Sequence, residues 1–388
     1  MLFVNANIHT MEGPQISNGW LLTCGSTIQA LGNAADTPAA EKKYDCHGAD
    51  LYPGFVDAHT HLGMMEDGLT FEGDDVNEDT DPTTPQMRAI DALNPLDRDF
   101  FEAAAAGVTT VVTGPGSANP IGGQMAAIKT YCPSGCIDDS IVKAPVAIKM
   151  AMGENPKNVY RDKDSGPVTR MATAACIREE LLKAQHYQKA LQKSEEDEDT
   201  DPPEFDIKSE ALLPALRGEI EVHFHAHRAD DIFTAIRIGK EFHLDYVIVH
   251  GTEGHLIAPR LAKEHVRVLS GPFLADRSKP ELRNQTPACP GILAKAGVQT
   301  AIITDHSVIP IQYLPLCAGV AVREGMDREA ALRAITIEPA CICHIEDRVG
   351  SLKPGKDADF SLFDSDPLSS YTKPLLVVEN GEIVYQRT

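Results

Sequence analysis

The segment Gly54-Phe55-Val56-Asp57-Ala58-His59-Thr60-His61-Leu62 contains two histidines, two residues apart, at the end of an apolar run. The run predicts a buried β-strand, and alternation along a strand places residues i and i+2 on one face. His59 and His61 can therefore meet a single metal ion at the end of the strand, and imidazole suits zinc and several other divalent metals. The pair alone is equally compatible with rings that only cap a turn.

The composition is that of a globular protein with an acidic surface. The 388 residues include 57 acidic and 35 basic side chains, which give a formal net charge of −22. This charge disfavours nucleic acid and anionic membranes as partners. The first residues lack the basic and long apolar regions of a secretory signal, so cytoplasmic residence is the default expectation. Nine cysteines in a chain of this length do not predict a disulfide framework.

The middle of the chain alternates strand-like and helix-like segments, which predicts a parallel sheet, either closed or doubly wound. The predicted strands cover residues 51–58, 109–113, 146–152, 220–224, 246–249, 266–269 and 300–304. The predicted helices cover residues 95–106, 170–192, 229–242, 255–264 and 290–296. Seven strands are one short of a (β/α)₈ barrel, and residues 124–130 are a weak candidate for the eighth.

Both ends of the chain differ from the middle. They carry short apolar runs separated by turn signals, which is typical of antiparallel strands. Near the C-terminus, Glu379-Asn380-Gly381 lies between two apolar runs and predicts a β-hairpin. We therefore predict one small β-sheet domain built from both termini.

Potential metal ligands recur where the predicted strands end, which is where barrels and open α/β sheets carry their chemistry. They are His223, His225 and His227 on one strand, His250 on another, Asp305 after the last, and Lys149 inside an apolar strand. Each has an ordinary structural role available: a histidine can bond a loop, an aspartate can cap a helix, and a lysine can reach solvent. Several such coincidences, all at strand ends, favour a metal centre.

The order of these residues along the chain resembles that of the amidohydrolase superfamily of metal-dependent hydrolases. Residues 53–61 are similar to its first-strand motif, and residues 330–340 and 350–360 to its characteristic C-terminal segments. The nearest likeness is to the branch that contains imidazolonepropionase and related cyclic-amide and dipeptide hydrolases. The resemblance implies a distorted (β/α)₈ TIM barrel over residues 51–349, joined to a small β-sandwich formed by residues 1–50 and 350–388.

The resemblance also implies a set of six metal ligands: His59, His61, Lys149, His225, His250 and Asp305. The first two histidines and Asp305 would bind one ion, the last two histidines would bind a second, and a carbamate on Lys149 would bridge them. Glu154 is the alternative to Lys149 as the source of this carboxylate. Asp305 would also be the catalytic residue that moves a proton from the attacking water to the departing nitrogen. The expected cofactors are one or two divalent ions, with zinc favoured.

Substrate contacts are expected from the loops that follow the strands. The candidates are His227, Arg228, His255 and Gln124, and the guanidinium of Arg228 can hold a substrate carboxylate. The implied activity is hydrolysis of an amide-type C–N bond in a cyclic amide, an N-acyl compound or a dipeptide-like small molecule. The alternatives are deamination of a heterocyclic amine and a non-catalytic scaffold that keeps the barrel. The expected partner is a small-molecule substrate, and a homo-oligomer is compatible with the sequence.

Overall fold

The computed structural model describes residues 1–388, and the middle of the chain forms a barrel. Its sheet contains eight strands in chain order: β6 (Phe55–Thr60), β7 (Val108–Thr113), β8 (Ile121–Lys129), β9 (Ile141–Ala151), β10 (Glu221–Ala226), β11 (Tyr246–His250), β12 (Arg267–Ser270) and β13 (Thr300–Ile302). The gap between β13 and β6 is bridged by a later segment. There the Val56 N–H donates to Ile335 O and the Ile302 N–H donates to Ala334 O, each with an N···O distance of 2.8 Å. The predicted distorted (β/α)₈ barrel is confirmed.

One strand of the barrel runs against the others. The weak candidate at residues 124–130 is a real strand, β8, but it pairs antiparallel with both β7 and β9. The physical reason is the connection, because residues 114–120 alone separate β7 from β8, and a parallel crossover needs a dozen or more residues. The chain therefore turns back at the end of β7, and the link from β8 to β9 lies at the opposite end of the barrel.

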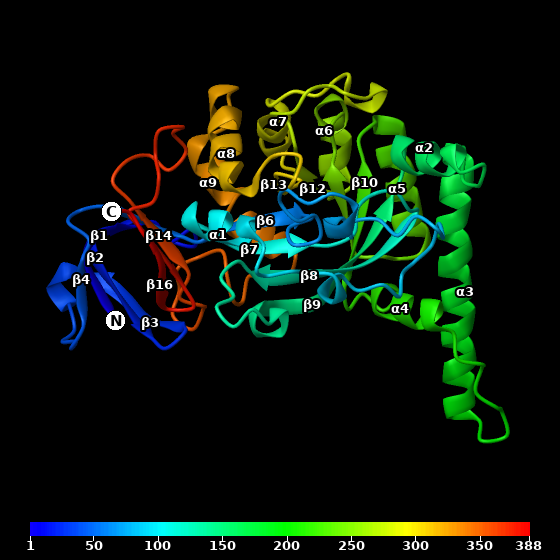
Figure 1. Cartoon of the computed structure of the whole chain (residues 1–388), viewed down its shortest axis with the longest axis horizontal. Helices are drawn as coiled ribbons and strands as arrows, with labels where there is room; N and C mark the ends of the chain where they lie inside the picture. Colours follow the sequence, from blue (N-terminus) through cyan, green and yellow to red (C-terminus); the bar gives the residue numbers. More distant parts are fainter.

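Ten helices accompany the strands: α1 (Arg98–Ala105), α2 (Glu154–Asp162), α3 (Arg170–Glu196), α4 (Ile207–Leu216), α5 (Ala229–Glu241), α6 (Gly254–Lys263), α7 (Cys289–Lys295), α8 (Leu314–Arg323), α9 (Arg328–Arg333) and α10 (Ile337–Ile342). The longest, α3, is capped by Thr169, whose hydroxyl accepts the Ala172 N–H at 3.1 Å. Its far end and the loop to α4 extend beyond the barrel (Figure 1). None of the helices combines the length and the apolar character needed to cross a membrane.

Side chains alternate between the barrel axis and the surrounding helices, as strand geometry requires. Ile148 and Val222 pack into the layer between strands and helices, whereas Ala147 and Val247 fill the inside of the barrel. Lys149 follows the same alternation and faces inward. The alternation of side chains along each strand therefore determines which polar side chains face the interior of the barrel.

The two ends of the chain form a second sheet beside the barrel (Figure 1), as predicted. Its strands are β1 (Leu2–Ile8), β2 (Ile16–Cys24), β3 (Thr27–Asn33), β4 (Lys43–Asp45), β5 (Asp50–Pro53), β14 (Phe360–Phe363), β15 (Leu376–Glu379) and β16 (Glu382–Gln386). Antiparallel pairing of β5 with β14 joins the N-terminal part to the C-terminal part. Residues from both parts, including Phe3, Leu21 and Phe360, share one apolar core.

A buried lysine connects the barrel to this second sheet. Lys129, at the end of β8, is 2% exposed and forms ion pairs with Asp357, at 2.9 Å, and with Asp359. A third carboxylate, Glu379 at the end of β15, is fully buried and accepts hydrogen bonds from Thr130 Oγ1 at 3.0 Å and the Tyr131 N–H at 2.8 Å. One ammonium thus serves a cluster of three acidic side chains at the junction.

Candidate metal centre

Five histidines from three strands converge at the end of the barrel where the parallel strands terminate. His59 and His61 come from the end of β6, His225 and His227 from the end of β10, and His250 from the end of β11. The ring centroid of His250 lies 4.5 Å from that of His225 and 4.4 Å from that of His227. It also lies 5.7 Å from that of His59, whose own partner His61 is 5.4 Å away. His250 therefore stands between two histidine pairs.

The backbone fixes which ring nitrogen of two histidines faces the centre. His61 Nδ1 lies 2.7 Å from Gly114 O, and His250 Nδ1 lies 2.7 Å from Gly271 O. A carbonyl oxygen only accepts, so each Nδ1 must carry the proton and each Nε2 must keep its lone pair. This is the arrangement in which histidines present a free nitrogen to a metal ion.

Two further histidines are oriented by hydroxyl groups. His225 Nδ1 lies 2.9 Å from Ser117 Oγ, and His227 Nδ1 lies 2.7 Å from Thr252 Oγ1. Burial lowers the pKa of both rings well below the usual value, and it lowers the pKa of His250 to about 4. Neutral imidazoles are the form that coordinates metals.

Asp305 follows β13 and reaches the same place. Its Oδ1 lies 3.5 Å from His59 Nε2 and 3.5 Å from His61 Nε2. Donor atoms of His59, His250 and Asp305 all lie within 4.8 Å of one another, and those of His225, His227 and His250 form a second such group. His250 belongs to both groups, so the donor set suits two neighbouring ions or one.

Lys149 lies at the bottom of this cluster and is fully buried. Its Nζ lies 3.1 Å from His59 Nε2 and donates to Pro115 O at 3.3 Å. Burial lowers the pKa of its ammonium to about 8. The neutral amine is thus far more accessible than in an ordinary surface lysine.

Glu154, the predicted alternative to Lys149, lies at the start of α2 with its carboxylate turned to a neighbouring turn. Its Oε2 accepts the Glu281 N–H at 3.3 Å, and Glu281 Oε2 accepts the Glu154 N–H at 3.1 Å. The geometry therefore brings Lys149, and not Glu154, against the histidines.

Glu281 itself was not singled out by sequence reasoning. It is 1% exposed, and its Oε1 lies 3.6 Å from His227 Nε2 and 3.9 Å from His225 Nε2. It belongs to the short 3₁₀ helix η5 (Pro280–Leu282) rather than to a strand end. The only sequence signal was its position in the loop after β12, where substrate contacts are expected.

A cavity of about 280 Å³ opens onto the cluster, and its lining includes His61, His225, His227, His250 and Asp305. The other predicted substrate residues lie outside it. Arg228 forks onto the Asp230 carboxylate at 2.9 and 2.8 Å, and His255 Nδ1 bonds Thr252 O at 3.1 Å. Gln124 faces a different cavity, where its amide donates to Pro85 O at 3.4 Å.

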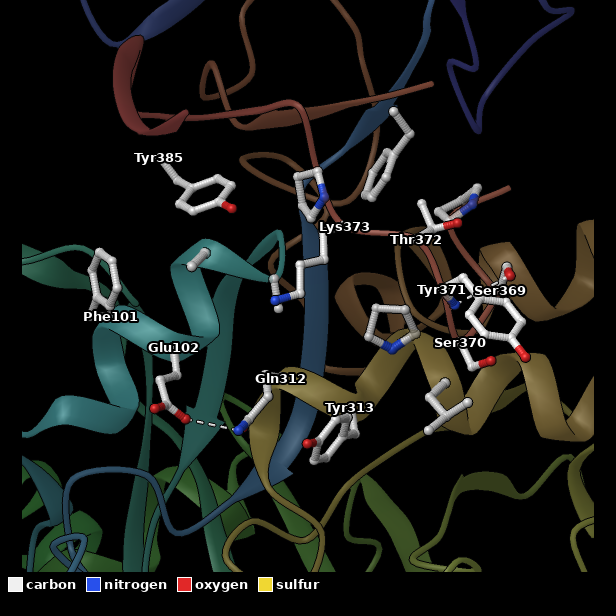
Figure 2. Close-up of a pocket in the computed structure, with 17 residues that line it drawn as sticks. Phe101, Glu102, Gln312, Tyr313, Ser369, Ser370, Tyr371, Thr372, Lys373 and Tyr385 are labelled. Carbon is white, nitrogen blue, oxygen red and sulfur yellow. Dashed lines mark hydrogen bonds between the residues drawn. The ribbon is translucent and has the colours of Figure 1, made fainter. Parts of the chain in front are cut away.

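A larger cavity, of about 500 Å³, lies between the barrel and the second sheet (Figure 2). Phe101 and Tyr385 stand on one side of it, Tyr371 on the other, and Glu102 accepts a hydrogen bond from Gln312 Nε2 at 2.8 Å. It brings together no histidine or cysteine side chains. The candidate metal centre is therefore the smaller cavity at the strand ends.

Comparison with known proteins agrees with this geometry. Residues 201–385 match the model of the Amidohydrolase family. The amidohydrolase tasK of Hapsidospora irregularis is 30% identical over 369 residues, which are 90% of this chain and 38% of that protein. An imidazolonepropionase of Cutibacterium acnes is 42% identical, but only over 55 residues, or 14% of each protein. The chain thus spans well under half of the length of the tasK protein, and the imidazolonepropionase match is a short local one.

A solved structure covers the whole molecule. The crystal structure of an amidohydrolase from Thermotoga maritima MSB8 superposes with a TM-score of 0.95 at 40% sequence identity, and the match covers 100% of both chains. The fold and this full-length similarity both indicate the same family. The chain belongs to the amidohydrolase family.

Proposed function

We propose that the protein is a divalent-metal-dependent hydrolase that cleaves an amide-type C–N bond in a small molecule. Membership of the family makes it a hydrolase or a deaminase. The main observation behind the proposal concerns His61 and His250, whose Nδ1 atoms each donate to a backbone carbonyl. Their free Nε2 atoms face a cavity shared with Asp305. Such preorientation is typical of histidines that bind a metal ion.

The residues present fit a metal centre of two ions. We assign His59, His61 and Asp305 to one ion, and His225 and His250 to the other. The nitrogen of His59 that faces Asp305 is Nε2, which lies 3.5 Å from Asp305 Oδ1. A centre of imidazoles and a carboxylate favours zinc.

We assign Lys149 as a further residue that would hold the metal, as a carbamate formed from its neutral amine and carbon dioxide with release of one proton. Its complete burial, its lowered pKa and its contact with His59 support this assignment. A carbamate would convert a buried cation among metal ligands, which is costly, into an anionic ligand.

When bound, divalent ions would lower the pKa of a water molecule and polarise the substrate carbonyl. Asp305 then moves the proton: its carboxylate, beside His59 and His61, accepts it and delivers it to the departing nitrogen. The neighbouring residues Ser117 and Thr252 keep the rings of His225 and His227 in place.

Metal analysis together with turnover tests the proposal. The purified protein should contain one or two equivalents of a divalent metal and should hydrolyse members of a panel of N-acyl amino acids, dipeptides and cyclic amides. Chelation should abolish the activity, and zinc should restore it. His61→Ala should lose metal, whereas His47→Ala, which changes an 85% exposed side chain, should not.

Two results would contradict the proposal. A protein that releases ammonia from heterocyclic amines but cleaves no amide is a deaminase. A protein that binds no metal and is inert in both panels is a scaffold.

A further inference from the structure

Lys279 is the single lysine or arginine among the residues that line the cavity at the metal centre. It lies one residue before η5, and its side chain is 27% exposed. Lys279 therefore supplies the fixed positive charge that a substrate meets in this cavity.

The ammonium of Lys279 is held in place by two neighbours. It donates a hydrogen bond to Asn155 Oδ1 at 2.8 Å, and Glu281 Oε1 lies 2.8 Å away as its counter-ion. The amide of Asn155 in turn lies 3.4 Å from His225 Nε2. The charge is thus one side chain removed from a proposed metal ligand, and a lysine ammonium with three N–H donors retains capacity for a further acceptor.

The rest of the lining shows what else the cavity accommodates. Met65, Val76, Pro272, Leu282 and Val308 supply apolar surface. Asp276, the other charged side chain of the rim, is exposed, and its Oδ1 accepts the Arg277 N–H at 2.7 Å. A substrate with one negative charge and a small apolar group complements this surface.

We propose that Lys279 binds the carboxylate of the substrate, and that the substrates are therefore N-acyl amino acids or dipeptides with a free α-carboxylate beside the scissile amide. This inference rests on the proposed function and narrows its substrate class. Arg228, the cation that the sequence suggested for this role, is bound to Asp230 outside the cavity.

The test compares N-acetyl amino acids and dipeptides with their C-terminal carboxamides, using the zinc-loaded protein. Wild type should prefer the carboxylates by about 10- to 100-fold in kcat/KM, the range for a charge-assisted hydrogen bond. Lys279→Met should lose this preference, mainly through a raised KM for the carboxylates. Lys279→Arg should keep part of the preference.

Lys163→Met is the matched control, because Lys163 also pairs with one carboxylate, Asp79 at 2.8 Å, but lies outside the cavity. Its carboxylate preference should equal that of wild type. Because each variant is judged by a ratio of two substrates, general damage to the fold does not imitate the expected result.

Two results would overturn the inference and leave the hydrolase assignment intact. One is a wild type that cleaves carboxylates and carboxamides equally well, and the other is a Lys279→Met variant that keeps the preference. If zinc-loaded wild type cleaves neither series nor the cyclic amides of the panel, the proposed function is refuted, and this inference with it.

Discussion

Lys129→Met should destabilise the protein strongly, because the change removes a buried charge and keeps a similar volume. Breaking a buried ion pair costs about 3–5 kcal/mol when the remaining partner stays uncompensated. Asp357 would keep the guanidinium of Arg348, whose Nη2 is 2.9 Å away, whereas Asp359 would lose its cation. We therefore expect the lower part of that range, about 3 kcal/mol.

Urea unfolding, followed by circular dichroism, measures the loss. Lys183→Met is the control, because this lysine pairs with Glu179 and Glu180 on the surface of α3 with its side chain 52% exposed. Exposed pairs of this kind contribute below about 1 kcal/mol. Equal effects of the two substitutions would refute the reasoning that burial makes the Lys129 pair strong.

The pH dependence gives an independent check of the same reasoning. Without Lys129, burial and mutual repulsion raise the pKa of the remaining carboxylates in the folded protein above the unfolded values. The folded variant then binds more protons than the unfolded chain, so its stability falls as pH rises. The deficit relative to wild type should be smaller at about pH 5 than at about pH 8. A deficit that does not vary with pH would show that lost packing, and not charge, causes it.

Three further changes test other parts of the structure. Asp305→Asn should lower kcat by at least about 100-fold while some metal stays bound, and a variant of near-normal rate with the same metal content would contradict its catalytic role. Gly54→Ala would place a methyl group 2.8 Å from Thr109 Cγ2, so thermal unfolding should report a loss of about 1–3 kcal/mol, and an unchanged melting temperature would contradict this. His344 has a raised pKa because it is hydrogen-bonded to Asp245, at 2.8 Å. Its stabilising effect is therefore present below the unfolded pKa and lost as pH rises through the folded value, so His344→Asn should cost up to about 1 kcal/mol at acidic pH and nothing at alkaline pH.

The barrel strands and the positions of their histidines were both predictable, because the same strand periodicity indicates a buried strand and the face on which its side chains lie. An apolar run that ends in His-x-His predicts a buried strand and also places both rings at its end. Periodicity could not predict the direction of β8, because the side-chain period is the same for parallel and antiparallel strands. The link at residues 114–120 indicates an antiparallel β8, because it is too short for a parallel crossover.

The polar lining of the cavity was predicted less well than its metal ligands. Arg228 and Lys279 both follow strands and both have suitable chemistry. Three-dimensional packing distinguishes them, because Asp230 draws Arg228 to the surface while Asn155 and Glu281 hold Lys279 at the cavity. The Arg228–Asp230 and Lys279–Glu281 pairs each join residues two apart, so the local sequence offers both cations a partner. The contact between Lys279 and Asn155 joins residues far apart in the chain, and no local pattern encodes it.

The reversal of β8 also divides the loops of the barrel into two groups with different freedom to change. The link between β8 and β9 turns at the base, where Tyr131 contacts Glu379 of the second sheet, so insertions there cannot reach the substrate. A fused domain or an affinity tag placed in this turn should leave substrate choice untouched, whereas the loop at residues 114–120 holds His61 through Gly114 and His225 through Ser117. The link between β8 and β9 is therefore a place at the base of the barrel where insertions can be accepted, in evolution or by engineering, without changing the metal centre.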